Sequence, residues 1–186
     1  MKKVVLLGDS IRLGGYGPLV AQGFAGEFEV WQPDDNCRYV KYTQRGLHDW
    51  HHAINGADVI HWNNGIWDTL RIMDGDNFTP VDLYVAEMVR TAAALQRRGK
   101  VVIFATTTPI LPGYRHTTNE DIDRYNAAVV PRLREMGVVI NDLNGLLRDQ
   151  KEKYICEDQL HLSEEGRRVC AERVMAVIRQ NMDLTD

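Results

Sequence analysis

The stretch Val4-Val5-Leu6-Leu7-Gly8-Asp9-Ser10 places four branched aliphatic residues directly before a Gly, an Asp and a Ser. An unbroken apolar run of this kind is typical of a strand buried on both faces, as in a parallel sheet. Ser10 then lies at the carboxyl end of the strand, where the loops of an open α/β sheet converge on a crevice. Ser10 is therefore either a nucleophile on a tight strand-to-helix turn or only the cap of the following helix.

Strands and helices alternate through the rest of the chain. Apolar runs predict strands at 4–7, 28–31, 58–62, 100–106 and 138–140, and helices are expected at 18–24, 43–54, 80–98, 119–136 and from 164 onward. Thr79 is the expected N-cap of the helix that Pro80 opens, Thr118 or Asn119 caps the next, and Ser163 begins the last. Residues 141–162 are expected to be irregular.

This alternation implies right-handed crossovers and a parallel sheet between two helical layers. We predict one α/β domain over residues 1–186, with three α/β/α layers and a five-stranded parallel sheet in flavodoxin-like order. The formal net charge of −4 does not favour nucleic acid as a partner.

The three cysteines, Cys37, Cys156 and Cys170, suit a reducing compartment, since their spacing indicates neither a metal box nor a disulfide framework. Lys2 and Lys3 resemble the start of a signal peptide, but the apolar run behind them ends at Gly8. A cytoplasmic protein with no membrane association is therefore expected.

A serine hydroxyl becomes a nucleophile when a histidine takes its proton and an acid orients that histidine. The pattern Asp-x-x-His occurs three times, at Asp49 and His52, Asp58 and His61, and Asp158 and His161. The first pair lies on a helix leading away from the crevice, and the second on a strand, where this spacing points the side chains to opposite faces. Only the third pair is expected at the end of the sheet that holds Ser10.

Gly8-Asp9-Ser10 and Asp158-Gln159-Leu160-His161 together resemble the SGNH or GDSL hydrolases, and the resemblance spans the whole domain. The strings Gly8-Asp9-Ser10-Ile11-Arg12 and His61-Trp62-Asn63-Asn64-Gly65 are similar to a bacterial branch of that superfamily. The resemblance implies a flavodoxin-like fold, Ser10 as nucleophile, His161 as general base and Asp158 as the acid that orients it.

The chain departs from that family pattern in two places. Gly65-Ile66-Trp67-Asp68 carries Trp67 where the family has the Asn of its oxyanion hole. Asn63 is the favoured replacement, with Asn64 as the alternative and as a candidate substrate contact. The family's second donor, a glycine NH, corresponds to the region of Asn36, Cys37 and Arg38, which has no glycine.

The oxyanion hole is therefore expected to combine the Ser10 NH with donors from Asn63, Cys37 and Asn36. Trp67 and Arg38 are expected to contact substrate. Arg12 either holds an anionic group of the substrate or pairs with an acidic neighbour.

Two other residue patterns could indicate a ligand site, one for a metal and one for a phosphate. His48 and His52 share the i, i+4 spacing of a zinc site, but a third ligand is not evident. The glycines between 14 and 17 lack the spacing of a phosphate-binding loop.

We therefore predict a cofactor-free serine esterase whose partner is a small soluble ester, with an O-acetylated carbohydrate as the first candidate. An acyltransferase or thioesterase with the same triad, a metallohydrolase and a non-catalytic ligand-binding protein are the alternatives. The sequence does not predict the oligomeric state.

Overall fold

A computed structural model describes residues 1–72 and 75–185 of the chain. Its single sheet has five parallel strands in the order β2-β1-β3-β4-β5. The strands are β1 (Lys3–Leu7), β2 (Glu29–Trp31), β3 (Ala57–Asn63), β4 (Gly99–Ala105) and β5 (Val139–Asn141). The predicted α/β class and the flavodoxin-like strand order are confirmed.

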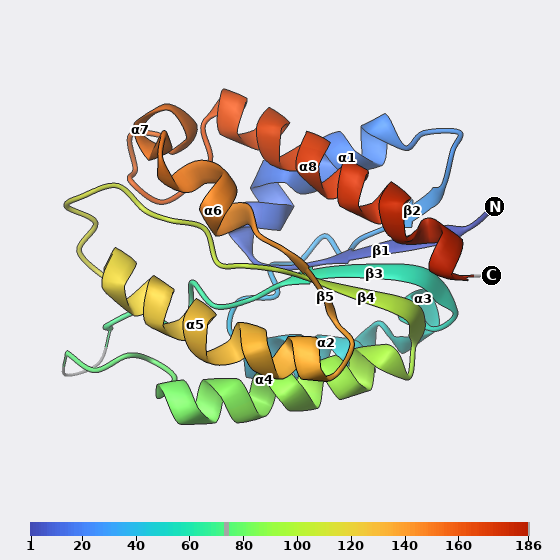
Figure 1. The fold of residues 1–186 in the computed structure, drawn as a ribbon, viewed down its shortest axis with the longest axis horizontal. Helices are drawn as coiled ribbons and strands as arrows, with labels where there is room; N and C mark the ends of the chain where they lie inside the picture. Colours follow the sequence, from blue (N-terminus) through green and yellow to red (C-terminus); the bar gives the residue numbers. More distant parts are fainter. Residues whose placement is uncertain (73–74, 186) are drawn as a thin grey trace.

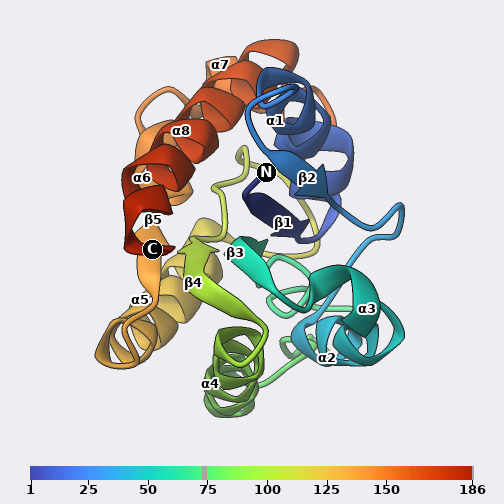
Figure 2. The same cartoon turned by 90° about the vertical axis from the view of Figure 1, so that its right-hand side faces the viewer.

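Helices cover both faces of the sheet (Figures 1 and 2). One face carries α1 (Gly17–Gly23), α6 (Leu143–Arg148), α7 (Lys151–Tyr154) and α8 (Glu164–Met182), with the short η1 (Arg12–Tyr16) and η2 (Asp183–Thr185). The other carries α2 (Val40–Asp49), α3 (His51–Ile54), α4 (Val81–Gln96) and α5 (Asn119–Glu135).

The apolar run of β1 explains this layering. Val4 and Leu6 pack into the core beneath α1 and α8, whereas Val5 and Leu7 pack into the core beneath α2 and α4. All four side chains are completely buried. A strand with both faces covered has no exposed side that would favour polar residues, which accounts for its continuous apolar sequence.

The helix caps agree with the sequence in two cases and differ in one. Thr118 Oγ1 accepts from the Asp121 NH at 3.1 Å, and Ser163 Oγ accepts from the Gly166 NH at 3.1 Å. Thr79 does not cap α4, because its hydroxyl donates to the buried Asp68 carboxylate at 2.7 Å. The buried Asp68 oxygen competes successfully with the helix for this hydroxyl.

Two further element predictions were wrong. Two helices replace the single helix expected at 43–54. The first begins at Val40, and Trp50, with φ of −101° and ψ of 15°, separates it from the second. The stretch 141–162 is not irregular, since it contains α6 and α7. Asp142 caps α6 by accepting from the Gly145 NH at 3.0 Å. Six-residue and four-residue helices carry too few apolar repeats for a periodic signal.

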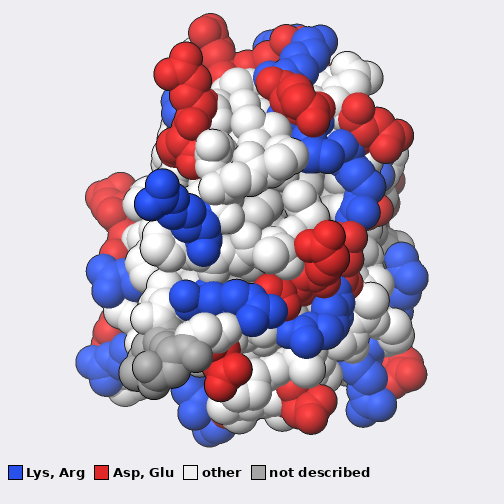
Figure 3. All heavy atoms as spheres, turned by 90° about the vertical axis from the view of Figure 1, so that its left-hand side faces the viewer, with Lys and Arg blue, Asp and Glu red and all other residues white. Residues whose placement is uncertain are grey.

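Because the sheet is parallel, the carboxyl ends of its strands lie along one edge, at the left of Figure 1. Figure 3 looks onto this edge and shows uncharged atoms across the middle of the face, with acidic and basic side chains around them. Among the described helices, none combines the length and apolar character needed to cross a bilayer.

Candidate active site

Ser10, His161 and Asp158 form a continuous hydrogen-bonded line at the carboxyl edge of the sheet. His161 Nε2 lies 2.9 Å from Ser10 Oγ, and His161 Nδ1 lies 2.6 Å from Asp158 Oδ2. Ser10 follows β1, and the other two residues lie in the loop between α7 and α8. The structure therefore brings together the three residues that the sequence predicted, in the arrangement that lets a histidine take a serine proton.

The loop that carries Asp158 and His161 is closed by its own backbone hydrogen bonds. The Cys156 NH donates to the His161 carbonyl at 2.8 Å, and the Gln159 NH donates to the Cys156 carbonyl at 2.9 Å. Gln159 adopts a positive φ of 70°, which completes the tight turn between the acid and the base. The Leu111 NH donates to the Gln159 carbonyl at 3.0 Å and ties the turn to the loop after β4.

The Asp158 carboxylate is held in its ionised form. Partial burial acts to raise its pKa, but the backbone NH groups of Leu160 and His161, together with the Cys156 thiol and the His161 ring, hold the pKa well below its usual range. The two NH groups donate to Oδ1 at 3.0 and 2.8 Å, which leaves Oδ2 for the imidazole. A fixed carboxylate orients the ring and stabilises the positive charge that develops on it.

The turn that carries Ser10 is shaped by its neighbours. Asp9 Oδ1 accepts from the Ile11 NH at 2.9 Å. A β-carbon on Gly8 would overlap the side chain of Asn63, so only glycine fits there. Asp9 is buried, and desolvation raises the pKa of its carboxyl to about 6, although hydrogen bonds from Asn63 and Ile11 oppose the shift.

Arg12 is not a substrate contact, which corrects one alternative drawn from the sequence. Its side chain is buried, and its guanidinium donates to the carbonyls of Pro33 at 2.8 Å, Asp35 at 2.6 Å and Gly8 at 3.3 Å. Arg12 therefore fastens the loop after β2 to the Ser10 turn. These three hydrogen bonds go to backbone carbonyls, and a fourth goes to Gln32 Oε1 at 3.3 Å, so the sequence offered no signal for this role.

The Cys37 backbone does not offer a free donor. Its NH donates to the Gly8 carbonyl at 3.0 Å, and its sulfur accepts from the Gly8 NH at 3.3 Å. The Asn36 NH is likewise occupied, by Asp35 Oδ1 at 2.8 Å. Of the backbone NH groups expected in the oxyanion hole, the Ser10 NH stays a prediction. The side-chain amide of Asn36 stays a second predicted donor.

Arg38 occupies the backbone conformation that favours glycine, with φ of 48°. Its NH donates to the Asn36 side-chain oxygen at 2.8 Å, and its guanidinium stacks on the Tyr42 ring at 4.5 Å. The side chain is exposed, and its contact with substrate stays a prediction.

Asn63 and Asn64 point into the protein, which corrects the expectations of Asn63 as an oxyanion-hole donor and of Asn64 as a substrate contact. Asn63 is buried, with its amide oxygen 2.9 Å from the Tyr16 hydroxyl and its other end on Asp9. The Asn64 amide is fully buried and engaged at both ends, because its oxygen accepts from Trp62 at 2.6 Å and its nitrogen donates to the Arg38 carbonyl at 2.8 Å. Both residues hold the strand end together.

Comparisons with known proteins give structural likeness only. Neither a protein-family model nor a curated protein matches the sequence. The structure is similar to a lipase/acylhydrolase from Enterococcus faecalis (TM-score 0.79, 19% identity, 97% of each chain covered). It is also similar to the acetyl xylan esterase AlAXEase (TM-score 0.78, 20% identity, 95% of this chain and 99% of that chain).

A third similar structure is the acetylxylan esterase Axe2 from Geobacillus stearothermophilus, with a TM-score of 0.72, 19% identity, and 95% of this chain and 94% of that chain covered. The chain shares its fold with these enzymes. At such identities the likeness is one of fold, and the chemistry of the site must be argued from its residues.

Trp67 lies on an apolar cluster that also holds the residue before the base. It packs, half-buried, against the buried cluster of Ile66, Ile110 and Ile122, as does Leu160, the residue directly before His161. Tyr114 packs on the same cluster, and the charge of Asp158 contributes to raising the pKa of its phenol after burial. The sequence predicted Trp67 as a substrate contact, but Tyr114 and Leu160 were missed. The position of Leu160 next to the base was the available signal.

The histidines of the second helix do not form a metal site. His48 lies in the last turn of α2, and His52 belongs to α3, so the break at Trp50 disrupts the shared helix face. His51 Nδ1 lies 2.8 Å from the His48 carbonyl oxygen. Within residues 1–72 and 75–185, no group of three or more His, Cys, Asp or Glu residues is arranged to hold a metal ion.

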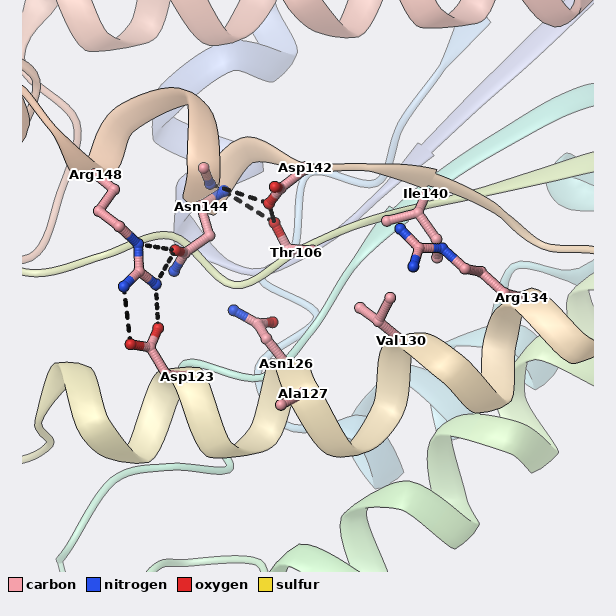
Figure 4. Close-up of a pocket in the computed structure, with 11 residues that line it drawn as sticks. Thr106, Asp123, Asn126, Ala127, Val130, Arg134, Ile140, Asp142, Asn144 and Arg148 are labelled. Atoms are coloured by element: carbon pink, nitrogen blue, oxygen red, sulfur yellow. Dashed lines mark hydrogen bonds and ion pairs between the residues drawn. The ribbon is translucent and has the colours of Figure 1, made fainter.

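A separate hollow of about 310 Å³ lies between α5 and the chain that leads from β5 into α6 (Figure 4). Arg148 pairs with Asp123 and also donates to Asn144, and Asp142 accepts from Thr106 at 2.8 Å. These pairs brace α6 against α5. The nucleophile, base and acid lie instead at the ends of β1 and the α7–α8 loop.

Proposed function

We propose that the protein is a serine ester hydrolase that works through an acyl-enzyme. The observation that carries this proposal is the line from Asp158 through His161 to Ser10, with contacts of 2.6 and 2.9 Å. The fold shared with an acylhydrolase and two acetyl xylan esterases is consistent with this chemistry.

In the first half of the reaction, Ser10 Oγ attacks the ester carbonyl carbon while its proton passes to His161 Nε2. The carbonyl oxygen becomes an oxyanion, which the Ser10 NH stabilises in this proposal. When the carbon–oxygen bond to the alcohol breaks, His161 returns the proton to the leaving oxygen, and the acyl group remains on Ser10.

In the second half, water attacks the acyl-enzyme while His161 accepts its proton, and the carboxylic acid leaves as Ser10 regains its hydrogen. The side chains of His161 and Asp158 are 39% and 49% exposed, so water reaches the base directly. This exposure favours hydrolysis over transfer to another acceptor, because transfer requires that water be kept from the acyl-enzyme.

We infer that the substrate is a small ester and that an O-acetylated carbohydrate is the first candidate. The half-buried Trp67 offers a flat apolar face on the cluster that Leu160, the residue before His161, also contacts, and such faces stack on sugar rings. Two of the similar structures are acetyl xylan esterases.

The test is burst-phase hydrolysis of p-nitrophenyl acetate by the parent, Ser10→Ala and His161→Ala, with and without EDTA. We expect both variants to lose activity by a factor on the order of 10³ or more, with no effect of EDTA. His52→Ala is the matched control, since His52 is exposed and lies on α3. Activity that survives Ser10→Ala, or that EDTA abolishes, would overturn the proposal.

A further inference from the structure

A line of hydrogen-bonded side chains runs behind Ser10, from the surface of α8 along the face of the sheet that α8 covers, to Asp9. Every member except the surface arginine is buried. The members and contacts, in order, are Arg173 Nε to Asn141 Oδ1 (3.4 Å), Asn141 Nδ2 to His61 Nε2 (3.1 Å), His61 Nδ1 to the Tyr16 hydroxyl (3.5 Å), the Tyr16 hydroxyl to Asn63 Oδ1 (2.9 Å), and the Asn63 side chain to Asp9.

The direction of every hydrogen bond in this line follows from its surface end. A guanidinium only donates, so the Asn141 oxygen faces Arg173 and its NH2 group faces His61. His61 Nε2 must then accept, and a neutral imidazole that accepts at Nε2 carries its proton on Nδ1. That proton points at the Tyr16 oxygen.

The same reasoning continues to Asp9. With its oxygen facing His61, Tyr16 gives its own proton to Asn63 Oδ1, which leaves the Asn63 NH2 group for the Asp9 carboxylate. Complete burial lowers the pKa of His61 to about 3, so the ring stays neutral and the direction does not reverse. All donors in the line therefore point toward Asp9.

Asp9 connects this line to the nucleophile. Its Oδ1 accepts from the Ile11 NH at 2.9 Å, across the residue that supplies the nucleophile. This contact sets the turn in which Ser10 Oγ faces His161. The carboxylate also attracts a positive charge on His161, the charge that forms when Ser10 loses its proton.

We propose that Asp9 is a positioning residue for Ser10, and that the line from Arg173 to Asn63 fixes the orientation of its carboxylate. The expected effect on turnover rests on the proposed function. The direction of the hydrogen bonds is independent of that function. The line of hydrogen bonds thus connects α8, β5, β3 and η1 to the turn that carries Ser10.

Other ionisable groups also face Asp9. Two of them favour its carboxylate, namely Arg12 and protonated His161, and the carboxylate of Asp68 opposes it. The full set is Arg12 and Tyr16 on η1, Cys37 after β2, Asp68 after β3, Tyr84 on α4 and His161 before α8. The hydrogen bond from Asn63 is distinct from these charges, because it depends on the line behind it.

The first experiment measures the tautomer of His61 in the parent protein by long-range proton–nitrogen NMR, with the signal assigned by comparison with His61→Gln. We expect the proton on Nδ1 and no titration from pH 5 to pH 8. A proton on Nε2, or protonation of the ring within this range, would reverse the line and overturn the proposal. This result does not depend on any catalytic activity, so it separates a failure of the inference from a failure of the proposed function.

The second experiment removes one oxygen from the line with Tyr16→Phe. We expect kcat for p-nitrophenyl acetate to fall by about tenfold with KM unchanged, as the loss of a hydrogen bond supporting a charged group predicts. The acid side of the pH profile should move to higher pH, because an Asp9 carboxylate that has lost its oriented donor ionises less readily.

Tyr125→Phe is the matched control. Tyr125 is equally buried, and its hydroxyl donates to the Thr79 carbonyl at 2.5 Å, outside the line. We expect it to lose stability without a change in kcat or in the pH profile. Equal effects of the two variants, or no effect of Tyr16→Phe on kcat, would reduce the line to a structural role and contradict the proposal.

Discussion

Gly8 and Asn63 are in such close contact that a β-carbon on Gly8 would overlap the Asn63 amide oxygen. The nucleophile turn and the end of β3 are therefore fitted to each other across the β1–β3 pair. The Gly of the first sequence motif serves this contact, and it also places its NH 3.3 Å from the sulfur of Cys37.

Gly8→Ala is expected to lower the free energy of unfolding by about 1–3 kcal/mol, since the added methyl group must displace the Asn63 amide. Activity should fall as well, because Asn63 supports Asp9. Gly14→Ala is the control, since a β-carbon on Gly14 meets no atom within 4 Å. Urea unfolding of both variants checks the prediction, and equal stabilities would contradict it.

Asp158→Asn is expected to reduce kcat by a factor on the order of 10³–10⁴ with little change in KM. The amide retains the shape of the carboxylate but cannot stabilise an imidazolium, and an amide NH2 facing His161 Nδ1 selects the wrong tautomer. Glu157→Gln controls for loss of a neighbouring exposed charge. Steady-state kinetics on p-nitrophenyl acetate provides the measurement, and a loss below tenfold would argue against Asp158 as the orienting acid.

The buried Asp68 should make stability depend on pH. Desolvation raises the pKa of its carboxyl to about 7. Between pH 4 and pH 7 the folded protein keeps a proton that the unfolded chain has lost, so this group's contribution to stability falls as pH rises. Below pH 4 both states hold the proton, and above pH 7 neither does.

Asp68→Asn removes this titration. We expect the stability of the variant relative to the parent to rise from pH 4 to pH 8, by up to about 4 kcal/mol. Asp49→Asn, on the exposed end of α2, is the control for removing a carboxylate that is not buried. Denaturant unfolding at several pH values makes the comparison, and a pH-independent difference for Asp68→Asn would show that its carboxyl ionises normally.

The sequence predicted those parts of the site that depend on local signals and on the geometry of a parallel sheet. The apolar run before Ser10 placed the nucleophile at a strand end, and the same rule selected Asp158 and His161 over the other two pairs. Arg12 and Asn63 could not be placed in this way. Their partners are backbone carbonyls and the side chains of Tyr16 and Asp9, which only the folded chain brings near. Polar residues after a strand look solvent-exposed in a sequence, whereas here they fill the space behind the nucleophile.

Trp67 is expected to act on the alcohol part of the substrate, because its half-buried ring lies on the same apolar cluster as Leu160, next to His161. For an acetylated xylo-oligosaccharide, Trp67→Ala should raise KM about tenfold, the effect of losing one aromatic stacking contact. For p-nitrophenyl acetate, kcat should change little, since the variant leaves Ser10 and His161 in place. Trp50→Ala is the control, because Trp50 is also half-buried but packs against Trp31. If both variants raise KM alike, or if Trp67→Phe fails to recover binding, the ring acts through packing and the sugar-stacking role is wrong.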